Sequence, residues 1–140
     1  MFRLELEKWP PSTNKLYTVW RNRKILSKEG MAYHNYVKFA VAQAMPPVIE
    51  MEEACEVHFL LYRPDWTNRG WPGKAKTRYK KIDLTNRLKC VEDALAESLA
   101  IDDSQFFDVI TRKCKGTEKI VIEVLVKKMP FSDGSTIPSS

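Results

Sequence analysis

The segment from residue 84 to about residue 100 constrains the fold most, because its apolar residues recur at helical spacing. At about 100° per residue, one stripe of such a helix carries Leu84, Leu88, Val91, Leu95 and Leu99. This stripe must be covered by other apolar side chains, and a chain with 44% hydrophobic residues can supply them. A helix that packs against a core is therefore expected here.

The start of the chain alternates between apolar and charged residues, with the two-residue period of a half-buried strand. Phe2, Leu4 and Leu6 are separated by charged residues, which predicts a strand. Proline cannot donate to a sheet ladder, so Pro10-Pro11 ends it. Residues 12–14 (STN) have the composition of a turn.

A second helix is expected from residue 29 to about residue 44, where apolar residues again recur at helical spacing. Ser27 is its candidate N-cap, and Pro46-Pro47 stops it. The remaining strands are expected at residues 17–26 (a short strand or a hairpin), 54–62, 105–115 and 118–128, the last two joined as a hairpin at Lys115-Gly116-Thr117.

The predicted architecture is α+β, a mixed β-sheet with two helices packed on one face. The elements follow the order β, short β, α, β, α, β, β. At 140 residues the chain has the size of one domain, which we place at residues 1–128. Residues 129–140 are small, polar and proline-containing, and we expect a flexible tail there.

The overall charge favours an anionic partner. The net charge is +5 and the pI about 9.1, which fits nucleic acid or an anionic surface. Three scattered cysteines without a C-x-x-C pair suggest neither a zinc ribbon nor a redox motif and fit reduced thiols in the cytoplasm. With no apolar signal region and no run long enough to span a bilayer, we expect a soluble intracellular protein and no membrane partner.

Acidic residues gather around the helix at 84–100. Its polar side and its flanks carry Asp83, Glu92, Asp93, Lys89 and the pair Asp102-Asp103. One interpretation is a solvated face, with Lys89 and Asp93 as an ordinary i,i+4 pair and Asp83 as an N-cap. The other is a site for Mg²⁺ or Mn²⁺, which favour carboxylate oxygens, with Lys89 placed to stabilise developing negative charge.

Three details favour the metal site. The adjacent charges of Asp102 and Asp103 repel each other unless a cation or a donor compensates them. Asn86 is a poor helix former within the polar set. A strongly basic segment also runs directly into Asp83.

That basic segment, residues 63–81, has no periodicity and contains prolines and glycines, which predicts a loop. Trp66, Trp71 and Tyr79 are interleaved with its cations and can stack on bases, although tryptophans that fold back onto the core are an equal alternative. Cations of this kind neutralise phosphates. We expect DNA contact from Arg63, Arg69, Lys74, Lys76, Arg78, Lys80 and Lys81.

Three motifs in this order resemble the RusA family of Holliday-junction resolvases, over roughly residues 5–128. Residues 9–17 (WPPSTNKLY) are similar to the family's P-P-S-x-N-x-x-Y, and residues 27–33 (SKEGMAY) to its S-x-x-G-x-x-Y. Residues 83–89 (DLTNRLK), with Asp93 and Asp102-Asp103, resemble D-x-D-N-x-x-K-x-x-x-D…D-D.

The resemblance implies a homodimeric, Mg²⁺-dependent endonuclease, common in phages and prophages, that acts on branched double-stranded DNA, the four-way junction. It implies Asp83 and Asp103 as catalytic metal ligands and Lys89 as the catalytic lysine, with Asp102 as a further metal position. Asn14 of the first motif joins the expected DNA contacts. Two cuts in opposed strands would suit a two-fold dimer.

The chain departs from the family pattern at Thr85, where the family has an acid. Thr85 can contribute its hydroxyl or a bound water, the site can be impaired, or Glu92 can replace the acid from the same stripe. Two other functions therefore stay open beside the resolvase. One is a junction-binding protein with a degenerate metal site, and the other is a structural or interaction protein.

Overall fold

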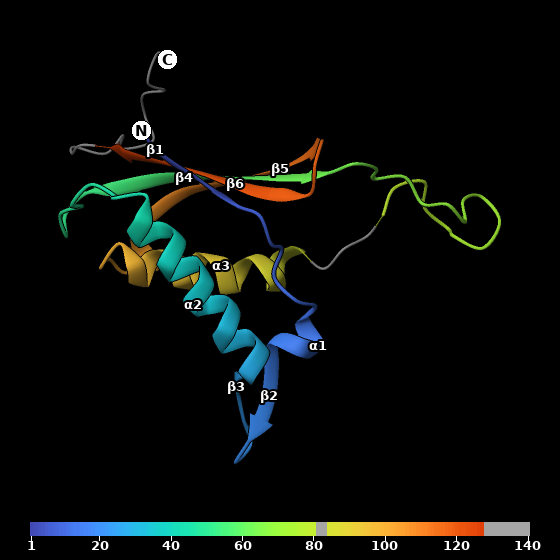
Figure 1. Ribbon diagram of the computed structural model, residues 1–140, viewed down its shortest axis with the longest axis horizontal. Helices are drawn as coiled ribbons and strands as arrows, with labels where there is room; N and C mark the ends of the chain where they lie inside the picture. Colours follow the sequence, from blue (N-terminus) through green and yellow to red (C-terminus); the bar gives the residue numbers. More distant parts are fainter. Residues whose placement is uncertain (81–83, 128–140) are drawn as a thin grey trace, which may run out of the picture.

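Strands from both ends of the chain meet in one sheet, and the helices lie below it (Figure 1). The computed structural model describes residues 1–80 and 84–127. The elements in these residues are β1 (Phe2–Leu6), α1 (Thr13–Leu16), β2 (Tyr17–Trp20), β3 (Arg23–Leu26), α2 (Lys28–Gln43), β4 (Ala54–Arg63), α3 (Leu84–Ser98), the short 3₁₀ helix η1 (Asp103–Gln105), β5 (Phe106–Lys115) and β6 (Lys119–Lys127).

The main sheet has the strand order β1-β6-β4-β5, with β4 and β5 parallel and the other neighbours antiparallel. A second sheet consists of β2 and β3 alone. Helices α2 and α3 cover the same face of the main sheet (Figure 1). The predicted α+β fold, a mixed sheet with two helices on one face, is confirmed.

The predicted hairpin between the last two strands is wrong, because β4 lies between β5 and β6. Residues 115–117 do reverse the chain, but the turn crosses the end of β4. There the N–H of Gly116 donates to the carbonyl oxygen of Arg63 at 2.9 Å. A Cβ at Gly116 would stand only 3.0 Å from the Tyr62 ring, so this close crossing favours glycine.

The core forms between the helices and the inner face of the sheet. The apolar stripe of α3 is buried as predicted at Leu88, Val91, Leu95 and Leu99. In β1 the burial alternates strictly, with Phe2, Leu4 and Leu6 facing inward. These side chains belong to one continuous apolar cluster, which fixes α3 relative to the sheet.

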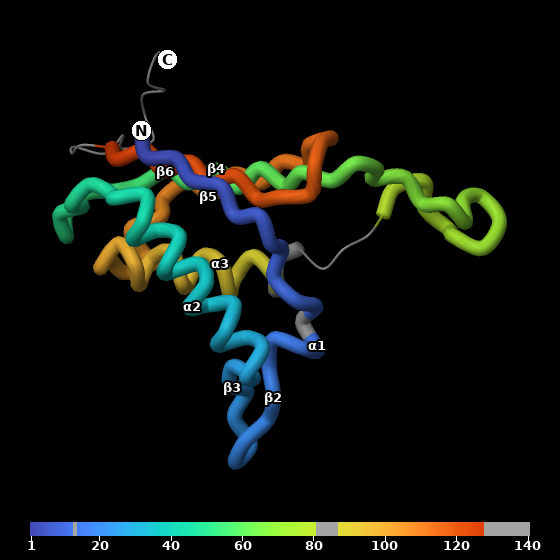
Figure 2. Tube along the Cα trace, in the orientation of Figure 1, coloured from blue at the N-terminus to red at the C-terminus, as the bar shows by residue number. Residues whose placement is uncertain are grey.

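The N-terminal part differs in detail from the prediction. The expected turn at residues 12–14 is instead the N-cap and the start of the single-turn helix α1, and residues 17–26 form a hairpin that points away from the main sheet (Figure 2). Ser27 caps α2 as predicted, since its hydroxyl accepts the N–H of Gly30 at 3.0 Å. In the described ranges no helix has the length and hydropathy needed to cross a bilayer.

Candidate metal and nucleic-acid site

The ammonium of Lys89 lies between two carboxylates on the exposed side of α3. Its Nζ is 2.9 Å from Oδ2 of Asp103 and 3.1 Å from Oδ1 of Asp93. Lys89 and Asp93 are about one helical turn apart, so the helix sets their spacing and the ordinary i,i+4 pair is formed. Hydrogen bonds to Asp103 and then Asp93 hold the pKa of Lys89 well above its usual range, which keeps the ammonium charged.

Asp103 reaches Lys89 because the chain changes direction after α3. Ala100 adopts a positive φ of 56°, and η1 begins at Asp103. Asp102 caps η1, since its carboxylate accepts the N–H of Ser104 at 2.8 Å, and hydrogen bonds from Ser104 lower its pKa. The neighbouring charges of Asp102 and Asp103 are thus each compensated by a donor within the chain.

Glu92 lies half-buried on the same side of α3. Its pKa is raised, first because burial disfavours the charged form and also because the Asp103 and Asp93 carboxylates repel it, while Lys89 partly offsets both. Three carboxylates therefore act on the single ammonium of Lys89. This surplus of negative charge suits a cation, and carboxylate oxygens are the ligands that Mg²⁺ and Mn²⁺ prefer.

The central residue of the predicted metal site, Asp83, lies outside the described residues. The side chains of Thr85 and Asn86 are likewise outside them, and so is Lys81. Within the described ranges, no three His, Cys, Asp or Glu side chains are arranged to hold a metal ion. The metal assignment to Asp83, Asp103, Asp102, Glu92 and Thr85 therefore remains a prediction.

Two further residues that the structure connects to α3 were not singled out from the sequence. Burial raises the pKa of the Tyr17 phenol, and the charges of Asp93 and Lys89 also act on it, which places Tyr17 beside the cluster. Arg87 donates from Nη2 to the carbonyl oxygen of Pro10 at 2.6 Å and so ties the start of α3 to the N-terminal segment. The signal for Tyr17 was its place at the end of the first motif.

The described part of the basic loop (residues 63–80) leaves the end of β4 and folds back on itself (Figure 1). Thr67 and Tyr79 form an isolated antiparallel bridge, and the N–H of Lys80 donates to Trp66 at 2.9 Å. Arg63 and Lys80 are half-buried, whereas Asn14 on α1 is exposed. The predicted cations of the loop that face solvent are Arg69, Lys74, Lys76 and Arg78.

The two tryptophans of the basic loop divide between the two alternatives. Trp66 folds back, since its Nε1 donates to the carbonyl oxygen of Cys114 at 2.7 Å and its ring lies 5.9 Å from that of Trp9. Trp71 is 46% exposed, and the guanidinium of Arg78 lies 5.8 Å from its ring. Of these two tryptophans, Trp71 is therefore the one available for stacking on a base.

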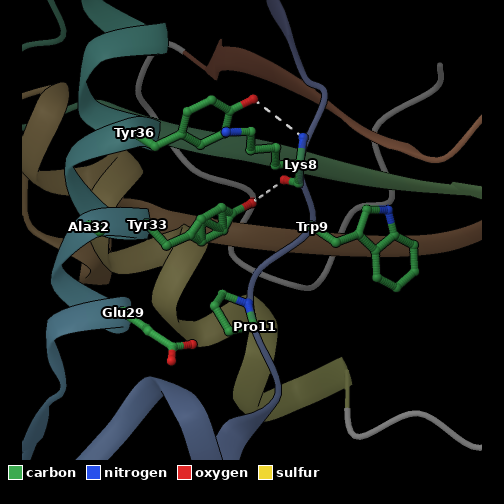
Figure 3. Close-up of a pocket in the computed structure, with 7 residues that line it drawn as sticks. All are labelled: Lys8, Trp9, Pro11, Glu29, Ala32, Tyr33 and Tyr36. Carbon is green, nitrogen blue, oxygen red and sulfur yellow. Dashed lines mark hydrogen bonds between the residues drawn. The ribbon is translucent and has the colours of Figure 1, made fainter.

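A cavity of about 300 Å³ lies between α2 and the segment after β1 (Figure 3). The Tyr33 hydroxyl donates to the carbonyl oxygen of Lys8 at 2.6 Å, and the Tyr36 hydroxyl accepts the Lys8 N–H at 3.3 Å. The described residues that line it, Trp9, Pro11 and Glu29 among them, include none of the predicted site residues. These bonds fasten the N-terminal segment to α2.

Comparison with known proteins relates the chain to a family of DNA-cleaving enzymes, the endodeoxyribonucleases. Residues 8–126 match the model of the family described as Endodeoxyribonuclease RusA. The chain belongs to the RusA family, as its motifs predicted.

Named relatives agree with the family match. The chain is 29% identical over 122 residues to the crossover junction endodeoxyribonuclease RusA of Shigella sonnei (strain Ss046), covering 86% of this chain and 90% of the relative. The protein of the same name from Escherichia coli (strain K12) has the same identity and coverage.

Proposed function

We propose that this protein resolves four-way DNA junctions by hydrolysing phosphodiester bonds with Mg²⁺, or with Mn²⁺ in its place. The family is one of endodeoxyribonucleases, and the relatives above are named crossover junction endodeoxyribonucleases. The observation that supports metal dependence best is the surplus of carboxylates around Lys89. The protein would act on DNA in the cytoplasm of a bacterium or of a phage-infected cell.

The residues divide into three roles. Asp83 and Asp103 hold the metal, with Asp102, Glu92 and Thr85 as further ligands. A bound divalent cation supplies an activated water and neutralises charge on the phosphate. Lys89 orients Asp103 through its 2.9 Å ion pair and offers its ammonium to the negative charge that develops in the transition state.

Glu92 is the carboxylate that replaces the acid missing at Thr85. Its pKa is raised, first by burial and then by the charges of Asp103 and Asp93 against the opposing charge of Lys89, and a bound cation would favour its charged form. Glu92→Gln should therefore slow cleavage. Junction cleavage by this variant at the rate of the parent protein would contradict the assignment and leave the Thr85 hydroxyl, or an impaired site, as the alternatives.

The basic loop holds the DNA backbone. Its predicted contacts are Arg63, Arg69, Lys74, Lys76, Arg78, Lys80 and Lys81, together with Asn14 on α1. Because cations on phosphates release counterions, affinity should fall steeply with salt. A homodimer places equivalent sites on the two opposed strands, and light scattering on a size-exclusion column tests this, with a stable monomer at micromolar concentration as the contrary result.

Thr85 favours a second candidate, a protein that binds junctions without cutting them. The two functions separate in one assay with a labelled synthetic four-way junction and a linear duplex of the same arms. With Mg²⁺ or Mn²⁺, the parent protein should nick the junction and spare the duplex. Asp83→Asn and Asp103→Asn should abolish nicking while binding persists.

A matched control exists on the other side of the sheet. Asp108 is 51% exposed and pairs with Lys127 at 2.8 Å, much as Asp103, at 41%, pairs with Lys89. Asp108→Asn should leave nicking unchanged. Binding without nicking by the parent protein would favour the second candidate, and salt-insensitive or absent junction binding would contradict both.

A further inference from the structure

The hairpin formed by β2 and β3 exposes large apolar side chains. Val19 is 74% exposed, Trp20 55% and Ile25 39%. The hairpin projects away from both the main sheet and the helices that cover it (Figure 1). Single exposed apolar residues are ordinary, but Trp20 and Ile25 share one face of this narrow ribbon, with Val19 on the other face, and such a grouping marks a surface that contacts a partner.

The charges of this hairpin identify the kind of partner. Residues 17–26 (YTVWRNRKIL) contain three cations and no acid. Arg21 places its guanidinium 4.4 Å from the Trp20 ring, and the Lys24 ammonium is 4.5 Å from the Tyr17 ring. Two copies of the hairpin would bring like charges together. A polyanion with accessible flat apolar faces, such as DNA with unstacked bases, complements both features.

The base of the hairpin is fixed beside the acidic cluster. Tyr17 is its first residue, and the charges of Asp93 and Lys89 act on the pKa of the Tyr17 phenol. At the other end, the N–H of Ser27 donates to the carbonyl oxygen of Leu16 at 2.8 Å. The hairpin therefore extends from the proposed cleavage site, and its direction is set by the same residues that begin α2.

The backbone at the tip of the hairpin fixes how its two strands pair. Arg21 and Asn22 both have positive φ, 49° and 60°, which is the backbone of a tight two-residue turn. The register that follows pairs Trp20 with Arg23 and Thr18 with Ile25. Since partners across a ribbon share a face, Trp20 lies on the same face as Arg23 and Ile25.

We propose that this hairpin contacts the branch point of the DNA and that Trp20 stacks there on a base that is not stacked within a duplex. The proposal rests on the junction specificity put forward above. In linear DNA every base face is covered by its neighbours, whereas a branch point offers free faces. The hairpin thus supplies selectivity for branched DNA, and the basic loop supplies affinity for the backbone.

Fluorescence anisotropy in EDTA, where no cleavage can occur, tests this with a four-way junction and a linear duplex. Trp20→Ala should weaken junction binding by about 5- to 100-fold, the range for loss of one aromatic–base stack, and change duplex binding little. Trp20→Phe should restore most of the preference, because it keeps a ring. Phe39→Ala, which removes an aromatic side chain that is 64% exposed on α2, is the matched control and should behave as the parent.

A second readout does not depend on affinity. A 2-aminopurine at the branch point should lose fluorescence when the parent protein binds, because stacking on an indole ring quenches it, and not when Trp20→Ala binds. If Trp20→Ala keeps both the preference and the quenching, or if it loses them only by converting a dimer to monomers, the hairpin proposal is overturned. A parent protein without any preference for junctions would instead overturn the proposed function itself.

Discussion

Replacing Lys89 by Met separates the catalytic role of this residue from its structural role. Methionine keeps the unbranched shape and the helix propensity of lysine and removes only the charge. The two ion pairs of Lys89 are solvent-accessible, with side chains 50%, 46% and 41% exposed for Lys89, Asp93 and Asp103. Exposed pairs contribute about 0.2–1 kcal/mol each, and two pairs that share one ammonium add up to less than their sum.

The expected cost in folding free energy is therefore about 1 kcal/mol, or about 3–5 °C in the unfolding midpoint for a chain of this size. Such a variant remains folded at room temperature. The expected cost in cleavage is much larger, because loss of one charge-stabilising group lowers the rate by about 10²–10³. The measurements are single-turnover nicking of a four-way junction and thermal unfolding followed by circular dichroism.

Lys127→Met is the matched control. Lys127 is 48% exposed and also bridges two carboxylates, Asp108 at 2.8 Å and Glu56 at 3.3 Å, but it lies at the end of β6. This variant should show a similarly small change in unfolding and full nicking activity. The catalytic assignment of Lys89 is refuted if Lys89→Met nicks within tenfold of the parent, or if its lost activity follows its lost folded fraction.

Two further predictions concern stability. Gly30→Ala should destabilise the fold by about 1–3 kcal/mol, although alanine normally favours a helix, because a Cβ there would collide with the carbonyl oxygen of Leu16. Gly73→Ala, where a Cβ meets only an ordinary contact, is its control in urea unfolding, and equal or higher stability of Gly30→Ala would contradict the packing described. The pKa of the Glu92 carboxyl is higher in the folded than in the unfolded protein. Folding stability is therefore lost as the pH rises from the unfolded-state pKa to the folded-state pKa. Glu92→Gln, which carries no charge, should have a higher melting temperature than the parent at pH 7.5 in EDTA. That difference should shrink toward about pH 4, and a lower melting temperature of Glu92→Gln at pH 7.5 would be the contrary result.

Local patterns were sufficient to predict the two long helices and the strands, but not the short helices α1 and η1. The stripe from Leu88 to Leu99 is buried because helical spacing depends only on neighbouring residues. The order of strands is different, since it depends on which edges meet in space. Residues 115–117 signal a reversal of the chain, but nothing in them indicates that β4 stands between the strands they join.

The site was predictable to the extent that its spacing is local. The pair of Lys89 and Asp93 follows from i,i+4 geometry. Asp103 joins this pair only because the chain changes direction at Ala100. The positive φ there is adopted by an alanine and not by a glycine, so the sequence carries no signal of the turn. The burial of Trp66 depends on the carbonyl oxygen of Cys114, far along the chain, so the sequence could not separate it from the exposed Trp71.

The most direct test is a crystal grown or soaked with Mn²⁺ and examined by anomalous diffraction. We expect one strong peak within about 2–2.5 Å of carboxylate oxygens from both Asp83 and Asp103, the range of metal–oxygen bonds. The peak should disappear in Asp103→Asn and persist in Asp108→Asn. Side chains of Asp83 and Asp103 that point to different sides of the molecule, with manganese elsewhere or absent, would contradict the shared metal site.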